Sequence, residues 1–147
     1  MCIRDSYYVE NVEKTIAFYE KAFGFNRKFV TPENDYGELA TGETTLAFAS
    51  MEMGNSNFKN GFQKIENKEK PIGIEIAFVT EEIEKDFQTA INAGAIELES
   101  IQNKPWGQKV GYLKDFNGIL IELCTSCLLY TSPSPRDRTR SRMPSSA

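Results

Sequence analysis

The sequence predicts an α+β protein built from two βαβββ modules, whose strands form a curved mixed sheet around a cleft. Two observations predict this fold. A strand end, a helix and a glycine follow one another from Val9 to Gly24, and again from Val79 to Gly94. Three strand-like segments then come after each helix. A single unit would leave an apolar face of its sheet uncovered, so the two units are expected to pack together.

Asn11 suits the start of the first helix, because its side chain can accept a hydrogen bond from a free N–H group of the first turn. Gly24 suits the left-handed end of that helix. The apolar residues between them recur at helical spacing: Val12, Ile16, Tyr19 and Phe23. Strands are expected after this helix at residues 25–31, 36–41 and 44–50.

The second helix is expected to be capped by Thr80, with Glu81 and Glu82 placed favourably at the positive end of the helix dipole. Its apolar face would contain Ile83, Phe87, Ala90 and Ile91. Strands are expected at residues 96–101, 108–114 and 119–124. Asn117-Gly118 indicates a two-residue hairpin between the last two of these strands.

The composition divides the chain into five segments. The two modules occupy residues 7–50, with a truncated first strand, and 72–125. A Gly-, Asn- and Lys-rich linker or surface loop at residues 51–71 connects them. Residues 1–6 and 126–147 contain "MCIRDS" and "CLLYTSPSPRD", which read like translated adapter or vector sequence, so we expect both ends to be non-native. The Ser-, Pro- and Arg-rich tail is expected to be disordered. An alternative is that its "RDRTRSR" is an RNA-binding arm.

Composition also excludes several classes of function. The chain contains no histidine, which rules out Ser-His-Asp and Cys-His catalysis and His-rich metal sites. Its apolar runs are too short for a membrane span or a signal peptide. Its three cysteines have neither metal-ligand nor disulfide spacing, which favours the cytoplasm. The tail has a net charge of +3 and the whole chain −4, so the rest carries −7, which argues against nucleic acid as a partner.

Strand alternation places two carboxylates on one face of the second unit. Ile119, Ile121 and Leu123 would point to one side of the last strand, and Glu122 to the other. Glu75 follows the same alternation on its strand, so both glutamates are expected to face the cleft. They could share a proton and act as an acid/base pair. Alternatively, Glu122 could be a partly solvated carboxylate paired with lysine or tyrosine, and Glu75 could lie at an exposed edge.

Three other residues are candidates for ligand binding. Trp106, Gln108 and Tyr112 lie close together in the sequence and combine aromatic rings with an amide, a set that suits a small aromatic or amphiphilic ligand. Hydrophobic packing of the two rings is the alternative. Cys124 has apolar neighbours and no visible base, so we expect an inert thiol.

Three stretches together resemble the vicinal oxygen chelate superfamily, which groups glyoxalases, bleomycin-resistance proteins, fosfomycin-resistance enzymes and extradiol dioxygenases. They are "YYVENVEKTIAFYEKAFGF", "GIEIAFVTEEIEKDFQTAINAGA" and "KPWGQKVGYLKDFNGILIEL". The resemblance covers about residues 7–125. It implies the two-unit fold described above and, for many members, a homodimer in which each cleft can be built from two chains.

The resemblance also implies where a metal would be held. Metal-dependent members supply ligands from four strand positions, two in each unit. Glu122 matches the last position and has the expected residue type, whereas Glu75 stands where histidine is common. The positions in the first unit fall near Ala47 and Arg4, and alanine cannot bind a metal. Substrate or water would have to complete the shell of Mn²⁺, Mg²⁺, Ni²⁺ or Zn²⁺.

The sequence therefore leaves three functions open. The first is a protein that binds or sequesters a small cationic or aromatic molecule in an acidic cleft, similar to the bleomycin-resistance type. The second is a metal-dependent lyase or dioxygenase that acts on vicinal oxygens through Glu122 and Glu75. The third is a non-catalytic interaction module. The acidic core and the missing ligands favour the first.

Overall fold

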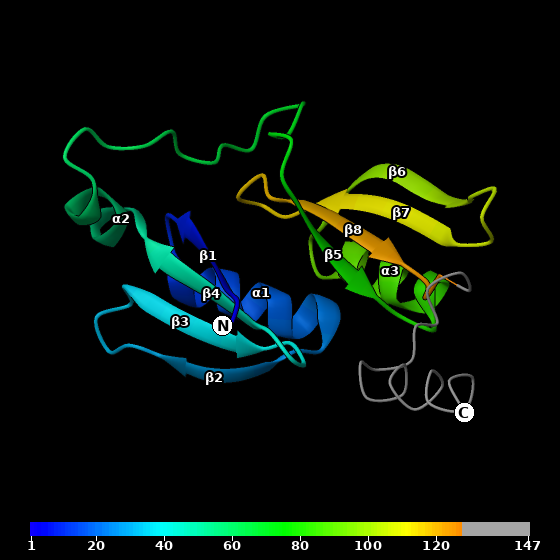
Figure 1. Cartoon of the computed structure of the whole chain (residues 1–147), viewed down its shortest axis with the longest axis horizontal. Helices are drawn as coiled ribbons and strands as arrows, with labels where there is room; N and C mark the ends of the chain where they lie inside the picture. The colour runs from blue at the N-terminus through cyan, green and yellow to red at the C-terminus, as the bar shows by residue number, and fades with distance from the viewer. Residues whose placement is uncertain (128–147) are drawn as a thin grey trace, which may run out of the picture.

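The computed structural model describes residues 1–127, in which eight strands form two four-stranded sheets accompanied by three helices (Figure 1). The elements are β1 Arg4–Val9, α1 Val12–Phe23, β2 Asn26–Val30, β3 Tyr36–Ala40, β4 Thr45–Ser50, α2 Met51–Asn57, β5 Glu75–Val79, α3 Ile83–Asn92, β6 Ile96–Asn103, β7 Lys109–Lys114 and β8 Leu120–Cys124. The predicted α+β class is confirmed. None of these helices has the length and apolar composition needed to cross a membrane. Disorder was predicted for residues 126–147, of which residues 128–147 lie outside the described range.

The first unit has the strand order β1-β4-β3-β2, with β1 parallel to β4 and the other neighbours antiparallel. α1 starts and ends as predicted. The Asn11 side chain accepts a hydrogen bond from the N–H of Lys14 at 3.0 Å, and Gly24 has a φ of 71°. Residues 4–6, from the segment expected to be non-native, belong to β1. They pair with β4 because strand pairing uses backbone groups whatever the side chains are.

The second unit repeats this plan with the order β5-β8-β7-β6. The predicted cap of its helix is wrong, because α3 begins at Ile83 and its N-cap is Glu82. Thr80 instead stabilises the turn that leads into the helix. Its hydroxyl accepts a hydrogen bond from the Glu82 N–H at 3.0 Å and donates one to the Asp86 carboxylate. A threonine hydroxyl can satisfy backbone groups in a turn as well as in a cap, and the sequence does not distinguish the two.

The hairpin between β7 and β8 is present, but its turn is longer than the predicted two residues. The N–H of Gly118 donates to the carbonyl oxygen of Asp115 at 3.1 Å, and Gly118 has a φ of 99°. The loop therefore resembles a turn followed by a left-handed glycine, which is the next commonest class of hairpin connection.

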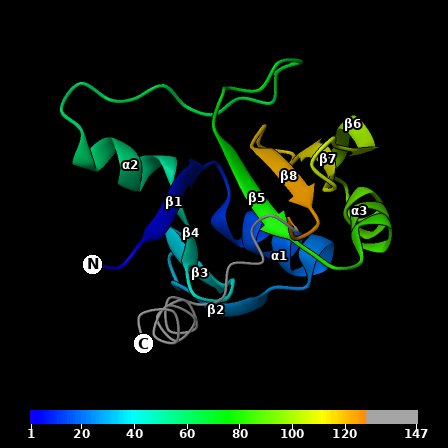
Figure 2. The same cartoon turned by 45° about the vertical axis from the view of Figure 1, so that its right-hand side comes forward.

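The linker contains a helix that was not predicted. α2 occupies the first part of the linker. The Ser50 hydroxyl stabilises the start of this helix by accepting a hydrogen bond from the Met53 N–H at 3.1 Å. Residues 58–74 then arch from α2 to the start of β5 (Figure 2). An aromatic cluster fixes the first part of this arch to β1, with the rings of Tyr8 and Phe62 4.7 Å apart.

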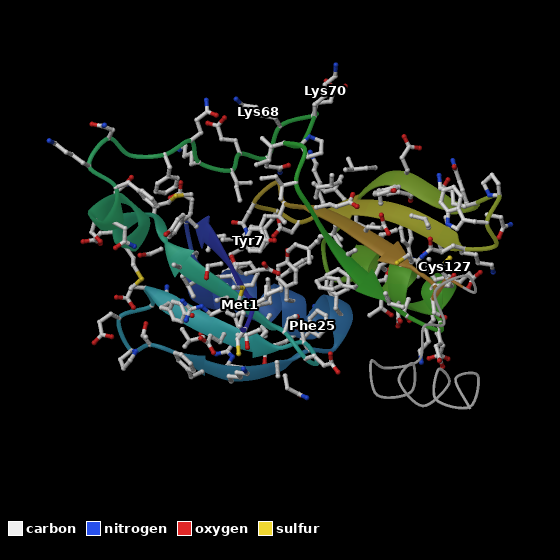
Figure 3. The ribbon with its side chains drawn as sticks, viewed as in Figure 1. Met1, Tyr7, Phe25, Lys68, Lys70 and Cys127 are labelled. Carbon is white, nitrogen blue, oxygen red and sulfur yellow. The ribbon has the colours of Figure 1, made fainter. Side chains whose placement is uncertain are left out.

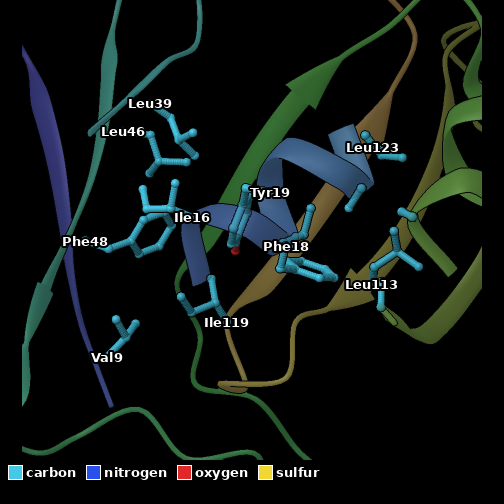
Figure 4. Close-up of a cluster of buried hydrophobic side chains, with 14 of the residues drawn as sticks. Val9, Ile16, Phe18, Tyr19, Leu39, Leu46, Phe48, Leu113, Ile119 and Leu123 are labelled. Atoms are coloured by element: carbon cyan, nitrogen blue, oxygen red, sulfur yellow. The ribbon is translucent and has the colours of Figure 1, made fainter. Parts of the chain in front are cut away.

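The two units share a core centred on α1 (Figure 4). The Tyr19 ring is fully buried, 5.0 Å from the ring of Phe48 on β4 and 6.4 Å from the ring of Phe78 on β5. α1 also packs against α3 of the other unit. Burial of these faces supplies the main driving force for joining the units.

The sequence predicted one curved mixed sheet, whereas the structure has two sheets that are not hydrogen-bonded to each other. Their inner strands, β1 and β5, border a cavity of about 420 Å³ instead of pairing. Tyr7 and Phe25 line it from the first unit (Figure 3). The mixed character of each sheet and the two-unit plan are as predicted.

Candidate functional site

The predicted glutamates lie on the face of the second sheet that points away from α3, which we call the open face. It carries Glu75, Ala77 and Val79 on β5, Leu120, Glu122 and Cys124 on β8, and Val110, Tyr112 and Lys114 on β7. The opposite face is buried, because Ile121, Leu123 and Leu113 belong to the core. The alternation that placed Glu75 and Glu122 on one side of the sheet is therefore found in the structure.

Glu75 and Glu122 are diagonal neighbours on this face. Glu122 pairs with Ala77 on β5, and Glu75 precedes Ala77 by two residues on the same strand. Burial raises the pKa of Glu75, and so does contact with the Glu122 carboxylate. Glu75 is nevertheless exposed, so water screens part of this repulsion. The two carboxylates thus form a local negative site that favours uptake of a proton or of another cation.

Tyr112 and Cys124 complete the surroundings of Glu122. Tyr112 pairs with Glu122 across the β7–β8 ladder. Burial raises the pKa of the Tyr112 phenol, and the charge of Glu122 adds to the effect. Burial and then Glu122 raise the pKa of the Cys124 thiol to about 11. Both groups are therefore protonated at neutral pH, and Cys124 is inert in the way the sequence predicted.

Lys114 is a polar residue of the open face that the sequence analysis missed. Only 7% of it is exposed, and its Nζ donates a hydrogen bond to the carbonyl oxygen of Lys68 in the linker at 2.6 Å. A lysine at a strand end would usually be assigned to the surface. Only the path of the linker over the hairpin shows that it is covered.

The three residues predicted to bind a ligand, Trp106, Gln108 and Tyr112, do not lie together in the structure. The indole N–H of Trp106 donates to the Gln108 side chain at 2.8 Å, and the Gln108 amide donates to the carbonyl oxygen of Thr125 at 2.8 Å. These two residues precede β7, whereas Tyr112 lies about 13 Å further along that strand by strand geometry. Tyr112 therefore accompanies Glu122, and Trp106 with Gln108 forms a separate, partly exposed cluster.

The first unit lacks an equivalent carboxylate on its fourth strand. Arg4 and Glu75 lie equally far before the first residues of their helices, which makes them equivalent positions. Strand pairing then makes Ala47 the equivalent of Glu122, as the resemblance implied, and Glu38 the equivalent of Tyr112. Ala47 is fully buried.

Glu38 and Tyr36 are site candidates that the sequence analysis did not select. The Tyr36 hydroxyl donates to Glu38 at 2.7 Å, and burial together with this bond raises the pKa of Tyr36 to about 12. Arg4 and Lys28 each approach the Glu38 carboxylate to 3.9 Å. The alternation of Tyr36 and Glu38 along one strand was the available signal. Both lie in the first unit, on β3, away from the second sheet.

This donor set does not fit a metal centre of the kind the superfamily implies. Glu75 and Glu122 are two acidic donors, while Ala47 and Arg4 supply none. Within residues 1–127, no three Asp, Glu, Cys or His side chains are placed so that they could share a metal ion. Two carboxylates leave most of the coordination shell of a divalent cation to other donors. We therefore derive no chemical step through a metal.

Comparison with known proteins agrees with this fold. Residues 5–128 match the family model described as a glyoxalase-like domain. The chain matches no curated protein. A glyoxalase-related enzyme from Fulvimarina pelagi superposes with a TM-score of 0.71 at 17% identity, covering 86% of this chain and 88% of that one.

Two further solved structures carry the superfamily name. A glyoxalase/bleomycin resistance protein/dioxygenase family enzyme from Burkholderia phytofirmans PsJN has a TM-score of 0.67 at 19% identity, covering 83% of this chain and 95% of its own. A member of that superfamily from Sphaerobacter thermophilus DSM 20745 has a TM-score of 0.64 at 21% identity, covering 86% and 97%. At these identities the likeness shows a shared fold alone. The family match and the two-unit fold show that the chain belongs to the glyoxalase-like family of the vicinal oxygen chelate superfamily.

Proposed function

We propose that the open face of the second sheet binds a small organic cation, with Glu75 and Glu122 as its counter-charges. The observation that carries this proposal is the diagonal placement of the two carboxylates on neighbouring strands of one face. Burial raises the pKa of Glu75, and the neighbouring Glu122 adds to this effect. A cation placed between them would relieve their repulsion. Part of its binding free energy would therefore come from removing an unfavourable charge interaction that the free protein already contains.

The surroundings of the carboxylates favour a cation with an apolar or aromatic body. Ala77, Val79 and Leu120 lie on the same face, and 66% of Val79 is exposed. Tyr112 adds an aromatic ring beside Glu122, which suits contact with an ammonium group or an aromatic ligand. Such a mixture of apolar area and a few charged groups is typical of small-molecule sites.

Two further features support this reading. The chain without its tail carries a charge of −7, which attracts cations over a longer range. Trp106 and Gln108 lie at one end of the same hairpin and would contact only a ligand long enough to extend beyond Tyr112.

We also propose that a second copy of the chain covers the open face. Val79, at the end of β5 on this face, is 66% exposed, which is unusual for an aliphatic residue bordering a site. Light scattering on the purified protein tests this, and a monomer at micromolar concentration would contradict it.

The test of cation binding is a calorimetric titration with benzylamine and phenethylamine, and with benzyl alcohol as the uncharged analogue. We expect the amines to bind and the alcohol to bind at least about tenfold more weakly, as the loss of a charge-assisted contact predicts. Glu122→Gln should remove this preference. Glu97→Gln makes the same charge change, but Glu97 pairs with Leu113 and lies toward the other face, so it should leave binding intact.

The same titration distinguishes the alternatives. Mn²⁺, Mg²⁺, Ni²⁺ and Zn²⁺ are added separately to wild type and to Glu122→Gln. Stoichiometric metal binding that is lost in Glu122→Gln would overturn the organic-cation proposal in favour of the metal-dependent enzyme. If a well-folded protein binds neither amines nor metals, the interaction module is the remaining reading.

A further inference from the structure

Asp115 is a fully buried carboxylate that the proposed site does not use. It lies in the turn between β7 and β8, and its Oδ1 accepts hydrogen bonds from the backbone N–H groups of Asn117 and Ile119, both at 2.9 Å. These bonds hold the turn in shape. A buried carboxylate is costly unless its oxygens are satisfied, so the remaining oxygen is informative.

The second oxygen of Asp115 reaches the other unit. Its Oδ2 accepts a hydrogen bond from the hydroxyl of Tyr19 on α1 at 3.0 Å, and another from the Asn117 side chain at 3.1 Å. The Asn117 amide also donates to the hydroxyl of Thr15 on α1 at 3.2 Å. Two residues of the turn thus bind two residues of the first unit's helix, and Asp115, Tyr19 and Thr15 in this network are fully buried.

The linker contacts the same turn from another side. A Cβ at Gly118 would overlap the carbonyl oxygen of Glu66, so the backbone of the linker lies directly against the turn. Lys114, just before the turn, donates to the carbonyl oxygen of Lys68. Figure 3 shows Lys68 on the arch above the hairpin. The first unit, the linker and the second unit therefore meet at residues 114–119.

We propose that this turn is the joint that locks the two units together, and that Asp115 is its central acceptor. A hydrophobic contact between α1 and the turn would join the units without fixing their orientation. A network of directional hydrogen bonds specifies one arrangement, because a shift of either unit would remove the Tyr19 donor from the buried Asp115 carboxylate and separate the Asn117 amide from Thr15. The inference is independent of what the open face binds.

If this turn locks the units together, they should unfold together in the wild-type protein and separately when the hydrogen-bond network is broken. Native-state hydrogen exchange measures the opening of each unit through the slowest amides of β3 and β7. We expect similar protection for the two sets in wild type. Tyr19→Phe removes one donor with little change of shape, and we expect protection in the two units to separate by about tenfold or more, the size of one hydrogen bond to a charged group.

Asp115→Asn should separate the units in the same way. The double variant should separate them no further than the stronger single variant, because both changes break the same bond. Tyr36→Phe is the matched control. It also removes a hydroxyl that donates to a carboxylate, but its acceptor Glu38 lies in the same unit.

Because the joint is intact in Tyr36→Phe, we expect this variant to lower protection in both units by the same amount, with no separation between them. The proposal is overturned if Tyr19→Phe and Asp115→Asn reduce stability while both units still open together. It is also overturned if the units of the wild-type protein already open independently.

Discussion

Glu75 and Glu122 lie diagonally across the pair of strands β5 and β8, on the same face as Ala77. Glu122 is the direct partner of Ala77 in the parallel ladder, and Glu75 stands two residues before that alanine. Burial raises the pKa of Glu75, and this diagonal placement lets the Glu122 carboxylate add to the effect.

Replacing Glu122 by glutamine should lower the pKa of Glu75 toward its ordinary value. The change removes the negative neighbour, while the burial of Glu75 is kept. Carbon-detected NMR of the carboxyl groups across a pH titration measures this directly. Glu97→Gln, on the other face of the same sheet, should leave the titration of Glu75 as it is in wild type. An unchanged Glu75 titration in Glu122→Gln would show that the two carboxylates do not interact.

Glu75→Gln should stabilise the protein at neutral pH and have little effect under acid conditions. The folded state of the wild type binds a proton at Glu75 more tightly than the unfolded chain does, so stability falls as the pH rises through the raised pKa. Because Glu75 is exposed, we expect a gain of only a few tenths of a kcal/mol. Urea unfolding at neutral pH and at about pH 4 compares the two proteins. A gain that persists at the acid pH would point to a cause other than charge.

Cys124 should react with thiol reagents much more slowly than Cys2. Its pKa is raised to about 11 and it is buried, whereas Cys2 is exposed. We expect a difference of at least about tenfold near pH 8, because the thiolate is the reacting form. Mass spectrometry of peptides after limited modification identifies the labelled residue, and unfolded protein serves as the control. Equal labelling of both cysteines in the folded protein would contradict this prediction.

Gly118→Ala should destabilise the protein more than Gly42→Ala. Both glycines have left-handed backbones, with φ values of 99° and 101°, and each substitution should cost about 1 kcal/mol in backbone strain. Only at Gly118 does the new methyl group meet another part of the chain, the Glu66 carbonyl, so we expect about 2 kcal/mol more. Urea unfolding of both variants measures the difference. Equal losses would mean that the linker moves freely away from the turn.

Much of the fold follows from short-range patterns in the sequence. The apolar positions Val12, Ile16 and Tyr19 are one face of a helix, and the structure buries all three. Alternation in β5 and β8 was sufficient to place Glu75 and Glu122 on the same side, because side chains of neighbouring strands in register share a face.

What the sequence did not reveal depends on contacts between distant segments. The burial of Lys114 requires the path of the linker, 46 residues away in the chain. The separation of Trp106 from Tyr112 follows from the side-chain bonds of Gln108, which hold the indole near the end of the strand. The sequence indicates only a turn at Asn117, although its side-chain amide also donates a hydrogen bond to the Thr15 hydroxyl, 102 residues away in the chain. No local pattern encodes such pairings.

The burial of Ala47 limits where an acidic side chain could be introduced into the first unit. A glutamate introduced there would lie in a fully enclosed position directly opposite Glu38, where a second negative charge meets both desolvation and repulsion. An engineered copy of Glu122 in the first unit would therefore require Glu38 to be replaced as well, so at least two substitutions are needed.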